Sequence, residues 1–437
     1  MDFMGDSLGS FSSMAVVPGS WKRDGERYTA KLVSLPDRGF NDPDKKFYSD
    51  YQGRLVEYDL TFTPYSGPAL PAAAESQRQI VLQPTGRGIK LTDFSGAATT
   101  GLDPDSHTVT QQGHVLPSPA EGPAAGKVSL DAEAIAFRAD GSFYVGDEYT
   151  AGIYLFGADG RMKGFIAPPA ALLPMSGGVV DYGSNDKPET GRRNNQGMEA
   201  VAITPDGTRL IAILQSGTIQ DSAGNAGDRN NTRILVYDIS ADPTPKAPVE
   251  HYALQLPIFA GKGDGSPADK AAAQSEVVAL DGHRLLVLSR DGNGLGCGCK
   301  APEVYKSVLL VDTKGATNLA GTEFETTPKP ISKGRELDAA ITPVRIVDLV
   351  NMLNTTQLAG FGLNIDNAAA GPLTLSEKWE AMALVPALDE ARPNDYFLLV
   401  ANDNDFQTAK GLMQGVPYDA GLTNDNMILA YRLTLPH

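Results

Sequence analysis

The sequence predicts an all-β fold, a β-propeller of about six four-stranded blades, with five blades as the alternative count. Three observations predict it: a hairpin pattern that recurs along the chain, short apolar runs typical of strands, and poor helical periodicity between them. A doubly wound α/β fold would require long amphipathic segments between the strands, and the sequence lacks them. We expect residues 1–437 to form a single propeller domain.

The recurring unit is a β-hairpin that begins with a polar residue. The five units begin at Ser12, Glu133, Glu199, Glu276 and Glu380. Each continues with alternating small and apolar residues, a turn, and a second apolar run that ends in polar or charged residues. Turns such as Pro205-Asp206-Gly207 tolerate positive φ, and the second runs, such as FYVGD and LLVLS, are too short for helices.

Further strands are expected between the hairpins and would complete each blade. Runs such as RLVEYDLTF and RILVYDIS have the composition of a third strand. The long interval between Ser12 and Glu133 leaves room for one degenerate extra unit around residues 54–115. This extra unit is the reason for expecting six blades.

The innermost strand of each propeller blade lines the central channel, so the first residues of the units should face one axis. Four of them are carboxylates: Glu133, Glu199, Glu276 and Glu380. Converging carboxylates repel one another and are costly to bury without a counter-charge. A hard cation with about six to eight oxygen ligands would neutralise them, and calcium (Ca²⁺) is favoured. Alternatively, any single Glu hydrogen-bonds neighbouring backbone amides and locks one blade to the next.

The second strands of the hairpins end in a matching polar set, which hairpin geometry brings to the same mouth of the channel. The set comprises Asp37, Arg38, Asp147, Glu148, Gln215, Arg290, Asp291, Asn402, Asp403, Asn404 and Asp405. From this set we expect Asp37, Asp147 and Asp403 to join the four Glu residues as metal ligands.

Charge and composition exclude several classes of partner. The net charge of −16 argues against a nucleic-acid-binding face, which needs an excess of Lys and Arg. No apolar run approaches the roughly 18 residues that span a bilayer, and no signal peptide is visible. The five histidines avoid the polar positions of the repeat, so a histidine metal site is not expected. We expect a monomer.

The two cysteines, Cys297 and Cys299, are separated by one glycine. A disulfide across a single residue would be strained, and two sulfurs are too few for a structural zinc site. We therefore expect a glycine-rich loop that carries two thiols, while a redox or soft-metal role remains open.

Several stretches together resemble the phytase-like propeller family known as "esterase-like activity of phytase". They are LPDRGFN, DAEAIAFRADGSFYVGDEY, NNQGMEAVAITPDG, SEVVALDGHRLLVLSRDG, and KWEAMALVPAL with ANDNDF. The likeness extends from about residue 5 to residue 432. The resemblance implies a secreted or periplasmic propeller that is grouped with phosphate-ester hydrolases.

The first functional hypothesis is a calcium-dependent hydrolase of phosphate esters or related esters, with its site at the mouth of the channel. Glu148 or Asp405 would act as general base or acid, and Arg38 and Arg290 would bind a small anionic substrate such as a phosphate ester. A lactonase-type hydrolase is one alternative, suggested by Asn194, Asn195 and Asn402 as amide ligands. The other is a non-catalytic propeller that binds a ligand or protein and holds calcium structurally.

Overall fold

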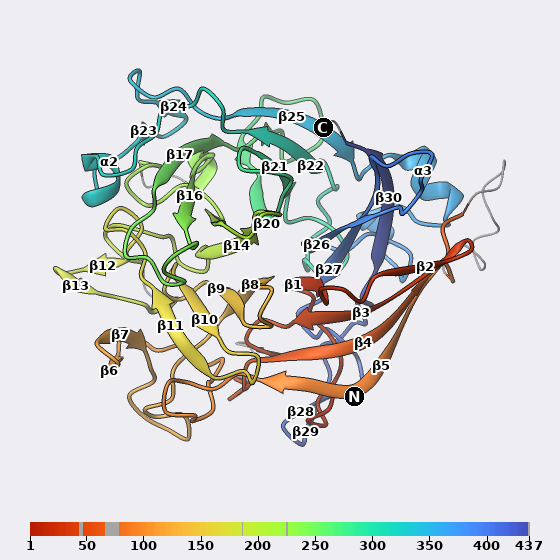
Figure 1. Cartoon of the computed structure of the whole chain (residues 1–437), viewed down its shortest axis with the longest axis horizontal. Coiled ribbons are helices and arrows are strands. Elements are labelled where there is room, and N and C mark those ends of the chain that lie inside the picture. Colours follow the sequence, from red (N-terminus) through yellow and green to blue (C-terminus); the bar gives the residue numbers. More distant parts are fainter. Residues whose placement is uncertain (43–46, 66–77, 186, 224–225, 436–437) are drawn as a thin grey trace.

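The computed structural model describes residues 1–42, 47–65, 78–185, 187–223 and 226–435. Its larger sheets are five in number and are arranged around a central axis (Figure 1). The fold is therefore a β-propeller, as the sequence predicts.

Each blade is formed by one continuous stretch of chain. The first contains β1 (Ser13–Val16), β3 (Arg27–Leu35), β4 (Arg54–Phe62) and β5 (Ile80–Lys90), with β2 (Lys22–Asp24) paired to β3. The second contains β8 (Ala132–Phe137), β9 (Phe143–Asp147), β10 (Ile153–Phe156) and β11 (Met162–Ile166). The third contains β14 (Met198–Ile203), β15 (Arg209–Leu214), β16 (Asn231–Asp238) and β17 (Glu250–Gln255). The fourth contains β20 (Ala273–Ala279), β21 (Arg284–Arg290), β22 (Lys306–Asp312) and β25 (Arg345–Asn351). The fifth contains β26 (Lys378–Pro386), β27 (Asp395–Asp403) and β30 (Ile428–Thr434).

The remaining elements are short insertions between the blade strands. The two-stranded hairpins are β6 (Thr108–Gln111) with β7 (His114–Pro117), β12 (Met175–Ser176) with β13 (Val179–Val180), β18 (Ile258–Phe259) with β19 (Lys270–Ala271), β23 (Ser332–Lys333) with β24 (Glu336–Leu337), and β28 (Gly411–Met413) with β29 (Val416–Tyr418). The helices are η1 (Ala226–Asp228), α2 (Glu323–Thr326), α3 (Thr355–Gly360) and η2 (Asn367–Ala369).

The expected count of six blades is wrong, and the alternative of five is correct. The extra unit expected around residues 54–115 does not exist, because β4 and β5 are the third and fourth strands of the first blade. The hairpin of β6 and β7 that follows forms a separate sheet and pairs with no blade strand among the residues that the structure describes.

The innermost strands β1, β8, β14, β20 and β26 surround the channel, and each contacts the next around a closed ring (Figure 1). Because strand side chains alternate between two faces, every blade packs against both of its neighbours. Five large hydrophobic clusters occupy the five interfaces between successive blades. The strand starts that carry the predicted site therefore meet at one end of a rigid ring.

The interface between the first and fifth blades closes the ring, and no strand of the described chain passes from one of these blades into the other. Its contacts are made by side chains. The Tyr28 hydroxyl donates a hydrogen bond to the Ala387 carbonyl (2.6 Å), and Trp21 Nε1 donates one to the Pro386 carbonyl (2.9 Å). The Tyr28 ring lies edge-on to Phe397, with 5.2 Å between the ring centroids.

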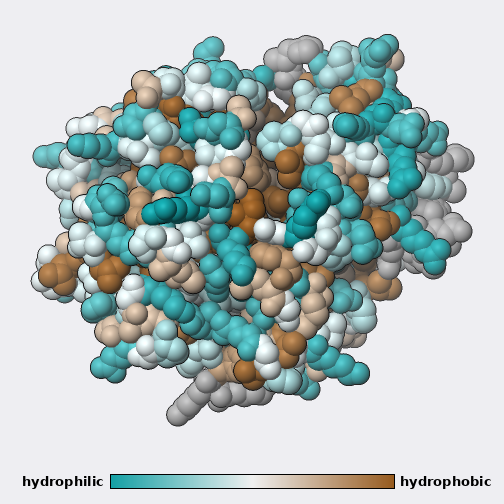
Figure 2. All heavy atoms as spheres, turned by 60° about the horizontal axis from the view of Figure 1, so that its bottom comes forward, coloured by the Kyte–Doolittle hydropathy of each residue, from teal (hydrophilic) through white to brown (hydrophobic). Residues whose placement is uncertain are grey.

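One face of the molecule is mostly hydrophilic, with its hydrophobic residues in small separate patches (Figure 2). This distribution agrees with the strongly acidic net charge of −16. Neither feature indicates a large apolar docking surface on that face.

Truncation of Tyr28 tests how strongly the closing interface stabilises the propeller. We expect Tyr28→Ala to lower the free energy of unfolding by about 3–5 kcal/mol, because it removes a buried aromatic ring and its hydrogen bond. Urea denaturation of both proteins measures the difference. The control is Tyr48→Ala, since Tyr48 is 59% exposed and its truncation should change the value by no more than about 0.5 kcal/mol. Equal losses for the two variants would contradict this account of ring closure.

Candidate metal and active site

A β-bulge interrupts the innermost strand of four blades at the same point. The extra residue of the bulge, which has no partner on the neighbouring strand, is Glu133 in β8, Glu199 in β14 and Glu380 in β26. A bulge re-aims the side chain of the extra residue, and bulges are common beside active sites. All three glutamates are buried near the channel mouth.

In the fourth blade the bulge falls on Ser275, one residue before Glu276. Glu276 therefore occupies the register position that alanines hold in the other blades. Its carboxylate accepts hydrogen bonds from the Ser13 hydroxyl of the first blade and from the Val277 amide (3.0 Å). Glu276 thus bonds neighbouring groups and lies outside the carboxylate groups described next.

Seven carboxylates form a continuous group at the channel mouth, which we call the acidic cluster. Its members are Asp37, Asp131, Glu133, Glu148, Glu199, Asp403 and Asp405. They form three overlapping trios, and within each trio one carboxylate oxygen per residue lies within 4.8 Å of the others. Asp37 links the first trio to the second, and Glu133 links the second to the third.

Cations compensate only part of this charge. Arg38 pairs with Asp131 (NH1 to Oδ2, 3.2 Å), and Lys378 pairs with Asp405 (Nζ to Oδ1, 2.7 Å). Among the described residues, no cation forms an ion pair with the other five members of the cluster. Those five, all buried, are Asp37, Glu133, Glu148, Glu199 and Asp403.

Burial is the main reason that the carboxylates resist ionisation. Burial, followed by the charges of Asp131 and Asp405, raises the pKa of Asp37 to about 7. Burial likewise raises the pKa of Asp131 to about 8, against the opposing effect of Arg38. The pKa values of Glu133, Glu199 and Asp403 also lie well above their usual range, because of burial and then of neighbouring carboxylates. Additional positive charge would therefore be strongly favoured here.

Glu380 differs from Glu133 and Glu199 because it has a buried cation partner. Arg290 NH2 forms an ion pair with Glu380 Oε1, and Arg290 Nε donates a hydrogen bond to Ser275 Oγ (3.1 Å). Arg290 is thus held by a carboxylate of the neighbouring blade. Arg38 is held in a similar way, since its NH2 also donates to Asn195 Oδ1 (2.8 Å).

Asp147 holds together two segments that each carry a member of the acidic cluster, since Asp131 directly precedes β8 and Glu148 directly follows β9. The Asp147 carboxylate accepts hydrogen bonds from the Thr150 amide (2.8 Å), the Thr150 hydroxyl (2.6 Å) and the Asp131 amide (2.9 Å). The Glu148 amide in turn donates to the Asp131 carbonyl (2.9 Å). A Cβ atom at Gly197 would lie 2.2 Å from the Glu148 carbonyl oxygen, so only glycine permits this approach of the third blade.

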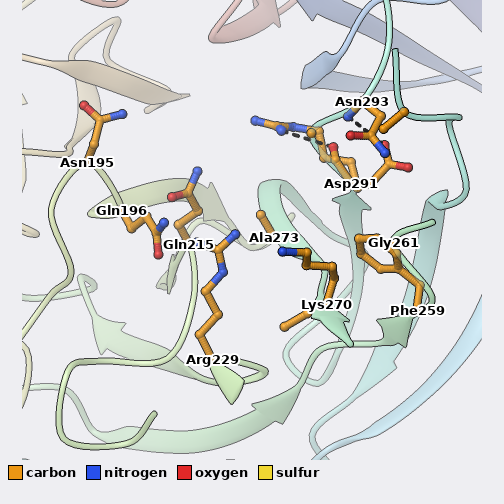
Figure 3. A pocket seen from close by; sticks show the side chains of 14 residues that line it. Asn195, Gln196, Gln215, Arg229, Phe259, Gly261, Lys270, Ala273, Asp291 and Asn293 are labelled. Carbon is orange, nitrogen blue, oxygen red and sulfur yellow. Dashed lines mark hydrogen bonds between the residues drawn. The ribbon is translucent and has the colours of Figure 1, made fainter. Parts of the chain in front are cut away.

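A cavity of about 340 Å³, which we call the side pocket, lies between the third and fourth blades at the same mouth. It is lined by residues that include Asn195, Gln215, Arg229, Lys270, Arg290 and Asn293 (Figure 3). Arg290 belongs to this wall and also pairs with Glu380, so the side pocket adjoins the glutamates of the bulged strands.

Four residues of the site are not predicted from the sequence, namely Asp131, Lys378, Arg229 and Lys270. Asp131 and Lys378 each precede a bulged glutamate by two residues, and this shared spacing in D-A-E and K-W-E is a signal that could have found them. Arg229 and Lys270 lie in insertions between repeat units, where no periodic pattern marks them.

The cysteines of the neighbouring loop form a disulfide, so the expectation of two thiols is wrong. The Cα atoms of Cys297 and Cys299 are 5.2 Å apart, which allows the bond, and the positive φ of Gly298 (63°) lets the chain reverse between them. The Asn367 amide donates to the carbonyls of Cys299 (3.2 Å) and Ala301 (2.9 Å) and so fixes the loop.

The sequence between Gly5 and Gly9 has the spacing G-x-S-x-G of a nucleophile elbow. Ser7 lies in no strand-to-helix turn, and its hydroxyl oxygen accepts a hydrogen bond from the Leu412 amide (2.8 Å). The segment therefore joins the N-terminus to β28 and does not present a nucleophile.

The chain is similar to known proteins along most of its length. The family described as "Phytase-like: Esterase-like activity of phytase" matches residues 21–406. The chain belongs to this phytase-like family. A relative from Arthroderma benhamiae, described as an "Uncharacterized secreted protein", is 32% identical over 445 residues, which cover 94% of this chain and 85% of the relative.

Solved structures give weaker likenesses to this family member. The Malassezia sympodialis allergen Mala s 1 is 11% identical, with 89% of this chain and 77% of that chain covered and a TM-score of 0.31. A luciferin-regenerating enzyme is 10% identical, with 98% and 92% covered and a TM-score of 0.31. Likenesses at this level support no argument about function. In the part of the chain that the structure describes, no helix is long and apolar enough to cross a membrane.

Two matched substitutions distinguish the charges of the site in metal-free protein at pH 8. We expect Glu199→Gln to raise the free energy of unfolding by about 1–3 kcal/mol, because it removes a buried carboxylate that neighbouring carboxylates repel and that forms no ion pair with a described cation. We expect Glu380→Gln to lower it by about 3–5 kcal/mol, because it leaves Arg290 buried without its partner. Urea denaturation after removal of divalent ions gives both values. Effects of the same sign would refute this assignment of charges.

Proposed function

We propose that this protein is a calcium-dependent hydrolase of phosphate esters or related esters, with its site at the acidic cluster. The observation that carries the proposal is the set of five buried carboxylates that have no cation partner among the described residues. Membership of a family described by an esterase-like activity supports hydrolysis. The relative described as secreted supports a secreted location for this chain as well.

The residues of the acidic cluster suit a hard cation. They offer only carboxylate oxygens, which are the preferred ligands of calcium, and burial followed by the neighbouring carboxylates raises the pKa values of Glu133 and Glu199. Asp37, Asp131, Glu133, Glu199 and Asp403 would hold the ion. When bound, such a cation lowers the pKa of a water molecule and polarises an ester oxygen.

Glu148 is the better of the two proposed general bases. Its carboxylate lies with those of Glu133 and Glu199, and no described cation pairs with it. The Asp405 carboxylate, by contrast, is already engaged in an ion pair with Lys378. Lys378 is held as a cation by Asp405 and by other carboxylates, and it would stabilise negative charge that develops on the substrate.

Arg38 and Arg290 would position the site more than they bind substrate. Each already pairs with a carboxylate, Asp131 for Arg38 and Glu380 for Arg290. Arg38 also bonds Asn195, which precedes β14 of the third blade, and Arg290 also bonds Ser275 of β20 in its own blade. Substitution of either residue should therefore affect the geometry of several carboxylates at once.

Hydrolysis of a phosphomonoester, a phosphodiester and a short acyl ester, each with calcium and after chelation, tests the proposal. We expect calcium-dependent turnover of at least one ester, and a decrease in kcat of about 100-fold or more in Glu148→Gln, because a general base is removed. The matched control is Glu121→Gln, since Glu121 is exposed on the surface. Lack of turnover, together with a melting temperature that falls on chelation, would instead indicate a binding propeller with a structural ion.

The dependence of melting temperature on pH tests the ion independently of turnover. A carboxylate whose pKa is raised in the folded state stabilises the fold below its unfolded pKa, and this stabilisation is lost as the pH rises through the folded value. With folded values of about 7 for Asp37 and about 8 for Asp131, metal-free protein should lose stability between pH 5 and pH 8. We expect calcium to raise the melting temperature by several degrees at about pH 8 and by little at about pH 5. An equal increase at both pH values would contradict binding by these carboxylates.

A further inference from the structure

The side pocket holds a guanidinium group that has no counter-charge in the described part of the chain. Arg229 Nε is buried and has no hydrogen-bond partner there, and no described carboxylate pairs with this side chain. Burial, together with the positive charges of Arg193 and Arg290, lowers the pKa of Arg229 to about 10. A buried cation placed beside other cations is costly unless an anion joins it.

The rest of the lining adds positive charge and offers little negative charge. Lys270 is exposed at the edge of the pocket and forms no ion pair with any described residue. Asp291 is the lining residue with a carboxylate, and its oxygens are already used by Lys306 Nζ (2.5 Å) and by the Val304 amide (2.7 Å). The pocket is thus locally basic in a protein whose net charge is −16.

Neutral groups complete a site suited to an anion that carries carbon. Figure 3 shows Arg229, Gln215 and Lys270 reaching into the same space. Asn195 Oδ1 accepts a hydrogen bond from Arg38, so the amide nitrogen of Asn195 takes no part in that bond. Phe259 stacks on Tyr305 with ring centroids 6.1 Å apart and supplies an apolar wall.

Two residues connect the side pocket to the acidic cluster. Arg290 lines the pocket, and the charge of the cluster member Glu199 acts on it. Asn195 lines the pocket and bonds the Arg38 that pairs with Asp131. The side pocket therefore adjoins the acidic cluster through these two residues.

We propose that the side pocket binds a second anionic group of the substrate, a phosphate or a carboxylate that is not the group hydrolysed. Arg229 is its principal ligand, with Lys270 and Gln215 beside it. The inference rests on the proposed hydrolase function, since it assigns the substrate class of that same site. It predicts that esters with a second anionic group are preferred over esters with a neutral group in the same place.

Binding of inorganic phosphate to metal-free protein, measured by isothermal titration calorimetry, tests the pocket without requiring turnover. Divalent ions are removed with a chelator, and the chelator is then dialysed away because it is itself a polyanion. We expect Arg229→Gln to weaken phosphate binding about 10-fold or more, and Arg229→Lys to restore part of the affinity. Acetate titrated in parallel distinguishes a preference for carboxylate from a preference for phosphate.

The matched control is Lys246→Gln, which removes one positive charge from the loop between β16 and β17. This loop lies at the opposite end of the third blade from Gln215, because Arg209 at the start of β15 pairs with Asp238 at the end of β16. The control should bind phosphate as the parent does. Equal affinity in the parent and Arg229→Gln would overturn the proposal. If Arg229→Gln fails to fold, Lys270→Gln replaces it, since Lys270 is exposed.

Steady-state kinetics separates this inference from the proposed function. For a hydrolysed ester that carries a second anionic group, Arg229→Gln should raise KM about 10-fold, while KM for the matched neutral ester stays unchanged. Arg229-dependent phosphate binding without any turnover would refute the hydrolase and retain the pocket as an anion site. Turnover whose KM is the same in parent and Arg229→Gln for both esters would refute the pocket and retain the hydrolase.

Discussion

The repulsion among buried carboxylates at the channel mouth is the constraint on which the rest of the site depends. Closing the ring of innermost strands necessarily brings Glu133, Glu199 and Glu380 together, because each occupies the same bulge of its strand. The described cations offset the charge at Asp131, Asp405 and Glu380 and leave five neighbours without a partner. A protein of marginal stability can tolerate such a group only if protons or a metal ion offset its charge. The raised pKa values and the proposed calcium site are therefore two responses to one electrostatic problem.

Ring closure and the charge of the site are coupled through the innermost strands. Each blade is a continuous stretch of chain, so the interface between the first and fifth blades is held by packing around Tyr28 and Phe397 and by a few hydrogen bonds. The acidic cluster spans the same interface, since Asp37 follows the first blade's β3 and Asp403 ends the fifth blade's β27. Repulsion between these two carboxylates pushes apart the blades that the aromatic side chains hold together. An ion bound between them would stabilise the fold at its one seam without a continuous chain segment across it.

The hairpin repeat and the approach of Glu133 to Glu199 could be predicted from the sequence. Both follow from the alternation of small and apolar residues and from the repetition of the Glu-led pattern along the chain. The position of Glu276 could not be predicted, since the bulge of its strand falls one residue earlier, on Ser275, and no residue pattern marks that shift. The blade count depended on whether the run at residues 54–62 begins a new sheet or extends an existing one, which is a tertiary choice. Arg229 and Lys270 lie in insertions outside the repeat, so their approach to the site follows from loop packing that periodicity does not encode. The disulfide between Cys297 and Cys299 likewise follows from the conformation of a single loop.

The separation of charge at the mouth gives a physical reason for assigning its two parts to one ligand. A basic pocket beside an acidic cluster would normally collapse into ion pairs, and Arg38 and Arg290 show how such pairs form here. Arg229 forms no such ion pair with a described carboxylate. The nearby charges that act on it are those of arginines, and one of these, Arg290, lies in the pocket wall and is already bonded to Glu380. The arrangement thus keeps a cation that no described carboxylate pairs with at the same mouth as carboxylates that no described cation pairs with, at a cost in stability that neither the ring nor the hairpins require. A ligand that presents an anion to the pocket, and a metal-bound ester to the cluster, would offset both costs at once, which is the energetic basis for expecting a substrate with two anionic groups.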